Sequence, residues 1–307
     1  MKTINYLIII VIFMIALDKN AQEQPGRVKQ NILKAVVKIL GPKDQIGNTP
    51  SGTGFLISKD FQSNGQLIRR IFLATNKHIL GDWNVADGNI SHYNEMLSVY
   101  FYKTAQTLGN YYELIGIDLK NKPKDQVMLH PNPKVDVALI CIDEETQKTK
   151  DLDLLSFDVS YFVPFEKVIS TYTGMGDQIF AIGYPFGITS LKNNYPIAKS
   201  CYLSSLPGTE MVVKMKVKNR NNEDKEIDVD GKIFLIDGLI VGGNSGSPIV
   251  LPAEIKTRIN PETKNIEWTK EETKNVVIGI VSSGWSSAGL TIIYSSDYIL
   301  ELINSVK

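Results

Sequence analysis

The 307-residue sequence lacks a surplus of either charge, a set of cysteines and any long apolar run. Lys and Arg together number 33, as do Asp and Glu, so the formal net charge is zero. A balanced charge gives no electrostatic reason to bind nucleic acid, which attracts basic faces. Two cysteines are too few for a disulfide scaffold. No apolar run reaches the ~20 residues that a membrane-spanning helix needs. What remains is an ordinary globular composition, 43% hydrophobic and 21% charged.

The first 21 residues predict an export signal. Lys2 supplies a positive charge, and the apolar run over residues 6–17 has the length of a signal-peptide core rather than of an anchor. We expect cleavage after Ala21, with Ala16 as a second cleavage site and an uncleaved N-terminal anchor as the competing interpretation. The mature protein, residues 22–307, is therefore expected to be periplasmic or secreted and to keep no stable membrane span.

Cys141 and Cys201 both lie in apolar, strand-like stretches. Export would permit a disulfide between them, but buried free thiols also pack as small hydrophobic groups. The sequence leaves both interpretations open.

Short runs rich in Val, Ile, Phe and Tyr recur along the chain and are separated by Gly, Asn, Asp and Pro. This spacing is typical of an all-β barrel or sandwich. Such runs lie at residues 35–40, 54–58, 70–75, 135–142, 178–184, 277–281 and 290–294. An acidic connector over residues 143–158 indicates two halves, residues 22–150 and 151–307. Ser296 or Asp297 would begin a short C-terminal helix.

An alternating pattern begins at Met211 and places Lys214, Lys216 and Lys218 on one face of an expected strand, which residues 219–224 would turn back as a hairpin. A solvated strand face explains this lysine stripe more simply than a ligand-binding patch.

The strongest chemical signal is the segment Gly242-Gly-Asn-Ser-Gly-Ser-Pro248. Glycines on both sides of Ser245 allow a tight turn and the close approach of a substrate carbonyl. The N–H groups of such a turn can converge on a developing oxyanion. A serine is a weak nucleophile without a base, so a Gly-rich β-turn with no catalytic role is the alternative for this segment taken alone.

His78 is the candidate base, because it ends an apolar strand that would hold its ring in a fixed place. The other two histidines, His92 and His130, lie in polar or Pro/Asn-rich stretches and are expected to be solvated loop residues. No histidine has the spacing of a metal-binding motif. Neither a metal nor another cofactor is therefore expected.

Asp136 is the candidate acid that orients this base. It stands where a turn enters a strongly apolar strand, so its carboxylate would be partly buried and would need a partner such as an imidazole N–H. A capping or surface aspartate is the alternative. The order His78, Asp136, Ser245 is the chymotrypsin-type order of a Ser-His-Asp triad and differs from the subtilisin and α/β-hydrolase orders.

Together these segments resemble the trypsin-like serine peptidases of the chymotrypsin fold, in particular their bacterial HtrA-like and glutamyl-endopeptidase-like branches. The matching pieces run in family order and are Gly52-Thr-Gly-Phe-Leu-Ile-Ser58, Thr75-Asn-Lys-His-Ile79, Asp136-Val-Ala-Leu139, Phe180-Ala-Ile-Gly-Tyr-Pro-Phe-Gly187, Gly243-Asn-Ser-Gly-Ser-Pro248 and Gly279-Ile-Val-Ser-Ser-Gly284. The resemblance implies two packed six-stranded antiparallel β-barrels, with the active site in the cleft between them. Unlike HtrA-like enzymes, this chain is expected to have no PDZ domain, since no segment of that size follows the matching pieces. The first barrel would carry His78 and Asp136, and the second would carry Ser245 and the C-terminal helix.

The resemblance also implies roles for single residues. Ser245 would be the nucleophile, His78 the general acid/base and Asp136 its orienter, while the N–H groups of Gly243 and Ser245 would form the oxyanion hole. The residues expected to bind substrate are Leu239, Val281, Ser282, Ser283 and Gly284. The last three match the strand that pairs with the substrate backbone in this family.

Three positions depart from well-known members of the family. Leu239 stands where trypsin has Asp, and Val281 stands where glutamate-cutting enzymes have His. Preference for Lys/Arg or for Glu therefore loses support, and an apolar or small P1 residue is expected. Asn244 replaces the Asp that pairs with a newly cut N-terminus in animal trypsins, so activity is not expected to require such a cut.

The sequence thus predicts an exported serine endopeptidase that acts on polypeptide substrates through an acyl-enzyme intermediate. The alternatives are a catalytically silent binding or adhesion protein that kept the fold, and an esterase that uses the same site. No oligomeric state is predicted.

Overall fold

A computed structural model gives the conformation of the chain over most of its length. The described residues are 28–42, 50–63, 65–107, 110–168, 173–190, 193–218, 224–238, 240–252, 257–259, 266–268, 275–285 and 289–306. The expected signal peptide and Leu239 lie outside these residues. Within them, no helix is both long and apolar enough to cross a membrane.

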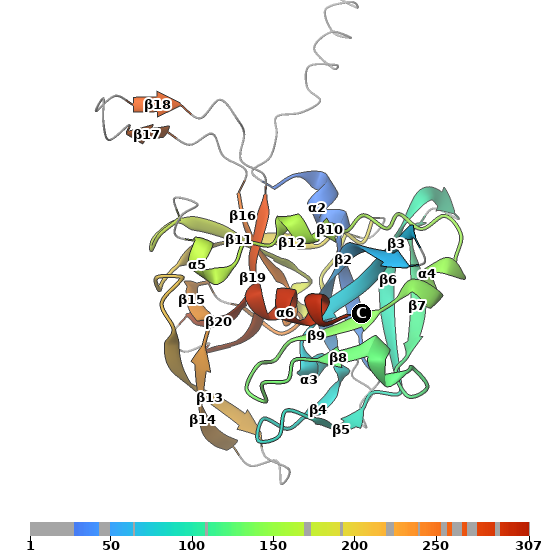
Figure 1. Ribbon diagram of the computed structural model, residues 1–307, viewed down its shortest axis with the longest axis horizontal. Coiled ribbons are helices and arrows are strands. Elements are labelled where there is room, and N and C mark those ends of the chain that lie inside the picture. The colour runs from blue at the N-terminus through green and yellow to red at the C-terminus, as the bar shows by residue number, and fades with distance from the viewer. Residues whose placement is uncertain are drawn as a thin grey trace, which may run out of the picture.

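Seven strands from the N-terminal half and one short strand from the acidic connector form the first sheet, eight in all (Figure 1). In order of pairing, seven of them are β7 (Asn110–Asp118), β6 (Met96–Thr107), β1 (Val36–Leu40), β2 (Ser51–Ser63), β3 (Gln66–Thr75), β9 (Ala138–Cys141) and β8 (Val127–Leu129). The eighth, β10 (Phe157–Asp158), pairs in parallel with β2 at Ile57 and Ser58. Room for β10 exists because β2 has 13 residues, whereas β1 has five and covers only the first part of β2.

Six strands from the C-terminal half close into a barrel. Around the barrel they are β11 (Gln178–Gly183), β12 (Ile197–Leu203), β15 (Ile233–Asp237), β20 (Leu290–Ser295), β19 (Val276–Trp285) and β16 (Pro248–Leu251). Every pairing in this barrel is antiparallel.

Short helices and three two-stranded hairpins complete the described fold. The helices are α2 (Gln30–Lys34), α3 (Lys77–Leu80), α4 (Asp143–Gln147), α5 (Phe165–Val168) and α6 (Asp297–Ser305), with single 3-10 turns at Lys124–Gln126, Val159–Tyr161 and Pro185–Gly187. The hairpins are β4 (Gly81–Trp83) with β5 (Ile90–Tyr93), β13 (Met211–Lys218) with β14 (Asp224–Gly231), and β17 (Thr257–Ile259) with β18 (Ile266–Trp268). In the second hairpin, exposed Lys214 lies opposite exposed Asp228. Such cross-strand charge pairs suit a solvated face.

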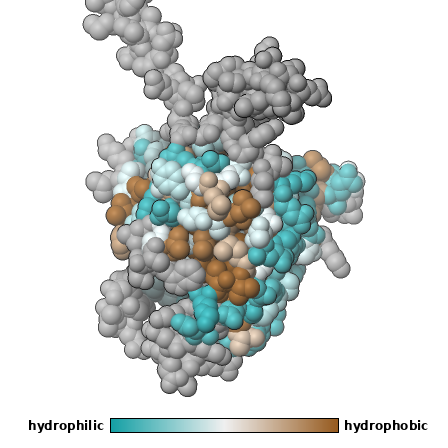
Figure 2. Space-filling view, turned by 90° about the vertical axis from the view of Figure 1, so that its left-hand side faces the viewer, coloured by the Kyte–Doolittle hydropathy of each residue, from teal (hydrophilic) through white to brown (hydrophobic). Residues whose placement is uncertain are grey.

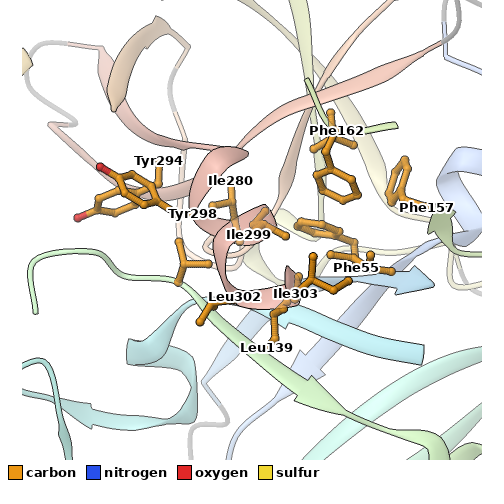
Figure 3. Packing of buried hydrophobic residues seen from close by; sticks show 14 of the residues in the cluster. Phe55, Leu139, Phe157, Phe162, Ile280, Tyr294, Tyr298, Ile299, Leu302 and Ile303 are labelled. Carbon is orange, nitrogen blue, oxygen red and sulfur yellow. The ribbon is translucent and has the colours of Figure 1, made fainter. Parts of the chain in front are cut away.

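The buried hydrophobic residues form three clusters, and one of them holds the two halves together. One fills the first sheet, one fills the barrel, and a third lies between them. Figure 3 shows this central cluster, in which Ile299 and Ile303 of α6 pack among Phe55 and Leu139 from the first half and Ile280 from the barrel. The helix buries one face because its apolar residues recur at helical spacing. The C-terminal helix thus packs against both halves and helps to hold them together.

The predicted all-β class with a short C-terminal helix is confirmed, and the C-terminal half is a closed six-stranded barrel. The first half departs from the expected six-stranded barrel, because its sheet has eight strands. Its end strands, β7 and β8, are not paired with each other within the described residues. The added strand β10 comes from the acidic connector, which the sequence indicated only as a link.

The two cysteines are buried free thiols rather than a disulfide. Cys141 lies in the first sheet and Cys201 in the barrel. The packing of Cys141 and Cys201 in separate clusters explains why they do not meet.

Some large hydrophobic side chains also reach the surface. The most exposed are Phe186, Leu67, Val212 and Met175. Figure 2 shows hydrophobic residues gathered in the middle of one face, with hydrophilic residues around them. Exposure of this kind is ordinary for globular proteins.

Candidate active site

His78 and Asp136 lie side by side although 58 positions separate them. His78 is in α3, which begins two residues after the end of β3, and Asp136 lies two residues before the start of β9, the strand that pairs with β3. Nδ1 of His78 lies 2.5 Å from Oδ2 of Asp136, and the backbone N–H of His78 donates to Oδ1 at 3.1 Å. Both carboxylate oxygens therefore hold His78, one through the ring and one through the main chain.

Asp136 is buried, with a side chain 1% exposed, whereas the His78 side chain is 36% exposed. The Ser282 hydroxyl also donates to Oδ2 of Asp136, at 2.8 Å. The side-chain amide of Asn76 donates to the main-chain carbonyl of Asp136 at 2.6 Å. A buried carboxylate needs hydrogen-bond donors, and here His78 and Ser282 supply them. The ring of His78 is the part of the pair that reaches solvent.

Burial of the His78 ring opposes its protonation, but the charge of Asp136 and the hydrogen bond to it outweigh this effect, so the pKa of His78 is raised above 6.5. The neighbouring Lys77 behaves in the opposite way. Its burial lowers the pKa of the ammonium to about 8, against the attraction of Asp136. Lys77 donates to the carbonyl of Asn132 at 3.1 Å and lies 5.9 Å from the ring centre of Trp83.

Ser245 lies on the turn between β15 and β16, on the barrel side of the site. Its hydroxyl donates to the Ser282 carbonyl oxygen at 3.2 Å. Ser282 therefore contacts Asp136 through its side chain and Ser245 through its main chain. No hydrogen bond joins Ser245 to His78 among the described residues. Catalytic hydrogen bonds are often loose before substrate binds.

The backbone conformation and close packing of the turn require glycine at positions 243 and 246. Gly243 has φ 93° and Gly246 has φ 85°, a left-handed region that residues with a Cβ rarely adopt. A Cβ at Gly243 would also collide with the Tyr184 carbonyl oxygen, and one at Gly246 with the Thr53 carbonyl oxygen. The turn therefore packs directly against the backbone of β2 and of the segment after β11.

Several carbonyl groups of this turn are fixed by hydrogen bonds. Gly242 accepts from the N–H of Phe186 at 2.7 Å, Asn244 from the N–H of Ser247 at 2.9 Å, and Ser245 from the N–H of Thr53 at 2.8 Å. By contrast, the N–H groups of Gly243 and Ser245 donate to no residue in the described part of the chain. These are the two groups that the sequence comparison predicts as the oxyanion hole.

Four of the five residues predicted to bind substrate lie on β19, namely Val281, Ser282, Ser283 and Gly284. Ser282 and Ser283 fall where the pairing of β19 with β20 shifts register, between Val281 and Gly284. Val281 is fully buried in the barrel cluster. Leu239 is outside the described residues.

His130 is not the solvated loop residue that the sequence predicted. Its side chain is 4% exposed, Nε2 lies 3.0 Å from Oε2 of Glu301 on α6, and its ring packs edge-on against Tyr298. The partner is 171 positions away, so the local sequence gives no sign of it. His92 is exposed, as predicted.

Sequence reasoning missed Asn76 and Thr53 as residues that support the site, although both lie inside the motifs that it identified. Among the described residues, no group of three or more His, Cys, Asp or Glu side chains is arranged to hold a metal ion.

The sequence matches the family model described as "Trypsin-like peptidase domain" over residues 52–254. No curated protein matches the chain. Among solved structures, the active form of the Rv3671c protease from M. tuberculosis is 14% identical, with a TM-score of 0.43 and coverage of 90% of this chain and 82% of that one. The MamO protease domain from Magnetospirillum magneticum is 12% identical, with a TM-score of 0.43 and coverage of 89% and 97%. A Glu endopeptidase is 15% identical, with a TM-score of 0.43 and coverage of 91% of each chain.

Proposed function

The chain belongs to the trypsin-like peptidase family and is a serine endopeptidase, and from this premise we propose that it is exported and cuts polypeptides through a Ser245–His78–Asp136 triad. The observation that carries the proposal is the joint contact of Ser282 with Asp136 and with Ser245, because this one residue connects the proposed nucleophile to the His78–Asp136 pair.

In the first step, the Ser245 hydroxyl turns from the Ser282 carbonyl, to which it donates a hydrogen bond, toward Nε2 of His78. Its oxygen then attacks the carbonyl carbon of the scissile peptide bond. His78 takes the hydroxyl proton, and a tetrahedral oxyanion forms. Collapse of this species breaks the C–N bond, and His78 returns the proton to the leaving amine. The product is an acyl ester on Ser245.

In the second step, His78 takes a proton from water, and the hydroxide that results attacks the acyl ester. The tetrahedral species collapses, Ser245 leaves and regains its proton from His78, and the carboxylic acid product departs. Peptide and water are the only reactants, so no cofactor is required.

Asp136 serves this chemistry by its position. The hydrogen bond from Nδ1 of His78 to Oδ2 fixes the tautomer in which Nε2 is free to accept a proton. The buried carboxylate then stabilises the imidazolium that forms in each step. The raised pKa of His78 reflects the same attraction.

The N–H groups of Gly243 and Ser245 are proposed to hold the oxyanion. Support comes from the carbonyls of the turn, which bond to other groups and leave these two donors unpaired within the described residues. Donors of this kind are already oriented before the charge develops, and losing one costs ~10²–10³ in kcat.

We further propose that substrate lies along β19 at Ser282–Gly284, where main-chain hydrogen bonds would read an extended peptide. We propose an apolar or small P1 residue, because Leu239 and Val281 stand where trypsin has Asp and glutamate-cutting enzymes have His. Export rests on residues 1–21, and the mature protein would act in the periplasm or outside the cell.

Cleavage of a peptide library by the purified full chain tests this proposal. Ser245→Ala should abolish turnover, whereas Ser91→Ala, which changes an exposed serine on β5, should leave it intact. Equal turnover by Ser245→Ala and wild type would overturn the triad assignment. No turnover in wild type or in either variant would instead favour a catalytically silent binding protein. Hydrolysis of ester substrates but not of peptides would favour an esterase.

A further inference from the structure

Thr53 on β2 makes an unusual set of contacts with the turn that carries Ser245. It is fully buried. Its hydroxyl donates to the Gly243 carbonyl at 2.7 Å, and its main-chain N–H donates to the Ser245 carbonyl at 2.8 Å. One residue of the first sheet thus holds two carbonyls of a turn that belongs to the barrel.

The direction of the Thr53 hydroxyl is determined by its surroundings. A threonine hydroxyl has one hydrogen to donate. The N–H of Tyr184 donates to Oγ1 at 3.1 Å, so Oγ1 is an acceptor there and its single hydrogen is directed at Gly243. The main chain of Thr53 is itself held, because the Thr75 hydroxyl donates to its carbonyl at 2.8 Å.

The Gly243 carbonyl matters because glycine allows the peptide groups on either side of it to rotate. Gly243 adopts φ 93°, a conformation that glycine enters and leaves with little steric cost. Its carbonyl has no other hydrogen-bond donor within the described residues. The Gly242 carbonyl on the other side is fixed by the Phe186 N–H at 2.7 Å. The Asn244 N–H of the same peptide group donates to the Val241 carbonyl at 3.2 Å. Among the described residues, the hydroxyl of Thr53 is the side-chain group that holds the Gly243 carbonyl, which lies between the two unpaired N–H groups.

We propose that Thr53 is a positioning residue for the oxyanion hole, and that its hydroxyl keeps the N–H groups of Gly243 and Ser245 convergent. The inference rests on the proposed function. It adds to that function a residue of the N-terminal half that orients N–H groups of the C-terminal half. Without the hydroxyl, the Gly243 carbonyl loses its partner, and the turn rearranges to satisfy it. Such a change weakens binding of the transition state more than binding of the substrate.

Four variants of the full chain test this inference. Thr53→Val keeps the shape of the side chain and removes the hydroxyl. Thr53→Ser and Thr53→Ala both remove the methyl group and differ from each other only by the hydroxyl. Thr146→Val is the matched control, because Thr146 is also buried and its hydroxyl also donates to a main-chain carbonyl, that of Ile142 on the way into α4.

We expect kcat to fall about 10- to 100-fold in Thr53→Val and Thr53→Ala, below the ~10²–10³ that loss of a donor costs, with KM changed less than twofold. Thr53→Ser should keep kcat within about threefold of wild type, and Thr146→Val should match wild type. Equal kcat in Thr53→Ser and Thr53→Ala would overturn the inference, as would a loss confined to KM.

Crystal structures of Thr53→Ala and Thr53→Ser give a second readout that needs no turnover. The Gly243 peptide should move in Thr53→Ala and stay in place in Thr53→Ser, and an unchanged turn in both would overturn the inference. The proposed function fails in a different way, through a wild-type chain that neither cleaves peptides nor depends on Ser245. If Thr53→Val does not fold, the Ser and Ala pair alone decides the result.

Discussion

The Ser282 hydroxyl donates to Oδ2 of Asp136 at 2.8 Å, joining the barrel to the first sheet at the buried carboxylate. The same oxygen is the partner of Nδ1 of His78. Ser282 therefore limits the directions in which the carboxylate can turn, and His78 with it. The main-chain carbonyl of Ser282 also accepts from Ser245, so one residue of β19 touches both the acid and the proposed nucleophile.

Removing this hydroxyl with Ser282→Ala should lower kcat by roughly tenfold, since hydrogen bonds to charged groups contribute ~1.5–3 kcal/mol and ~1.4 kcal/mol corresponds to tenfold in rate. The pKa of His78 should rise further, because Asp136 loses a competing donor. A pH–rate profile measures both effects. Ser282→Thr keeps the hydroxyl and should restore most of the activity, and a variant that stays as slow as Ser282→Ala would contradict this role.

Asp136→Asn should reduce kcat by ~10⁴ while the fold is kept, an estimate taken from the same change in a Ser-His-Asp triad. The amide keeps the shape of the carboxylate but favours the wrong tautomer of His78. Steady-state kinetics beside a thermal-unfolding control measure the effect. A fall of less than tenfold would show that Asp136 does not orient the base.

Activity should rise with pH along a titration whose midpoint lies above 6.5, because Asp136 raises the pKa of His78 and the base must be neutral to accept a proton. The attraction between protonated His78 and Asp136 also stabilises the folded protein. Its contribution is fully present below the ordinary pKa of 6.5 and is lost as pH rises through the raised value.

The pH dependence of kcat/KM gives the midpoint of the rise in activity. The difference in unfolding free energy between wild type and His78→Gln, measured as a function of pH, gives the contribution of the His78–Asp136 pair to stability. A kinetic midpoint below 6.5 would contradict the assigned effect of Asp136.

Lys77 should produce a stability change at higher pH. Burial lowers its pKa to about 8 from an unfolded value of 10.5, so between these values the unfolded chain binds more protons than the native one. The native state therefore gains stability as pH rises through this window. Lys77→Met cannot titrate, and its difference from wild type in urea midpoint should vary between pH 7.5 and 10. A constant difference would mean that Lys77 keeps an ordinary pKa.

Ile299→Ala should destabilise the protein by ~2–5 kcal/mol, because Ile299 is fully buried in the cluster between the two halves. Ile299→Val removes one methylene group and should cost only ~0.5–1.5 kcal/mol. Chemical denaturation measures both. Equal, small effects would show that α6 does not hold the seam.

The sequence predicted the parts of the site whose signal is local. Ser245 lies among glycines that its turn requires, and His78 and Asp136 lie at the ends of apolar runs that became the neighbouring strands β3 and β9. The closed barrel of the second half was predicted by resemblance rather than by any one strand.

The remaining features depend on partners far along the chain. His130 is buried with Glu301 as its partner. The eighth strand of the first sheet, β10, pairs with the part of β2 that extends beyond its pairing with β1. The role of Thr53 depends on the direction of a single hydroxyl, which no pattern of residue types encodes. Each of these is a tertiary contact that composition and spacing do not specify.

The most direct test of the account is to find where a serine-directed fluorophosphonate attaches to the full chain, by peptide mapping with mass spectrometry. We predict one modified residue, Ser245, with labelling lost in Ser245→Ala and strongly slowed in Asp136→Asn. Labelling at another serine, or none in a folded wild-type protein, would contradict it.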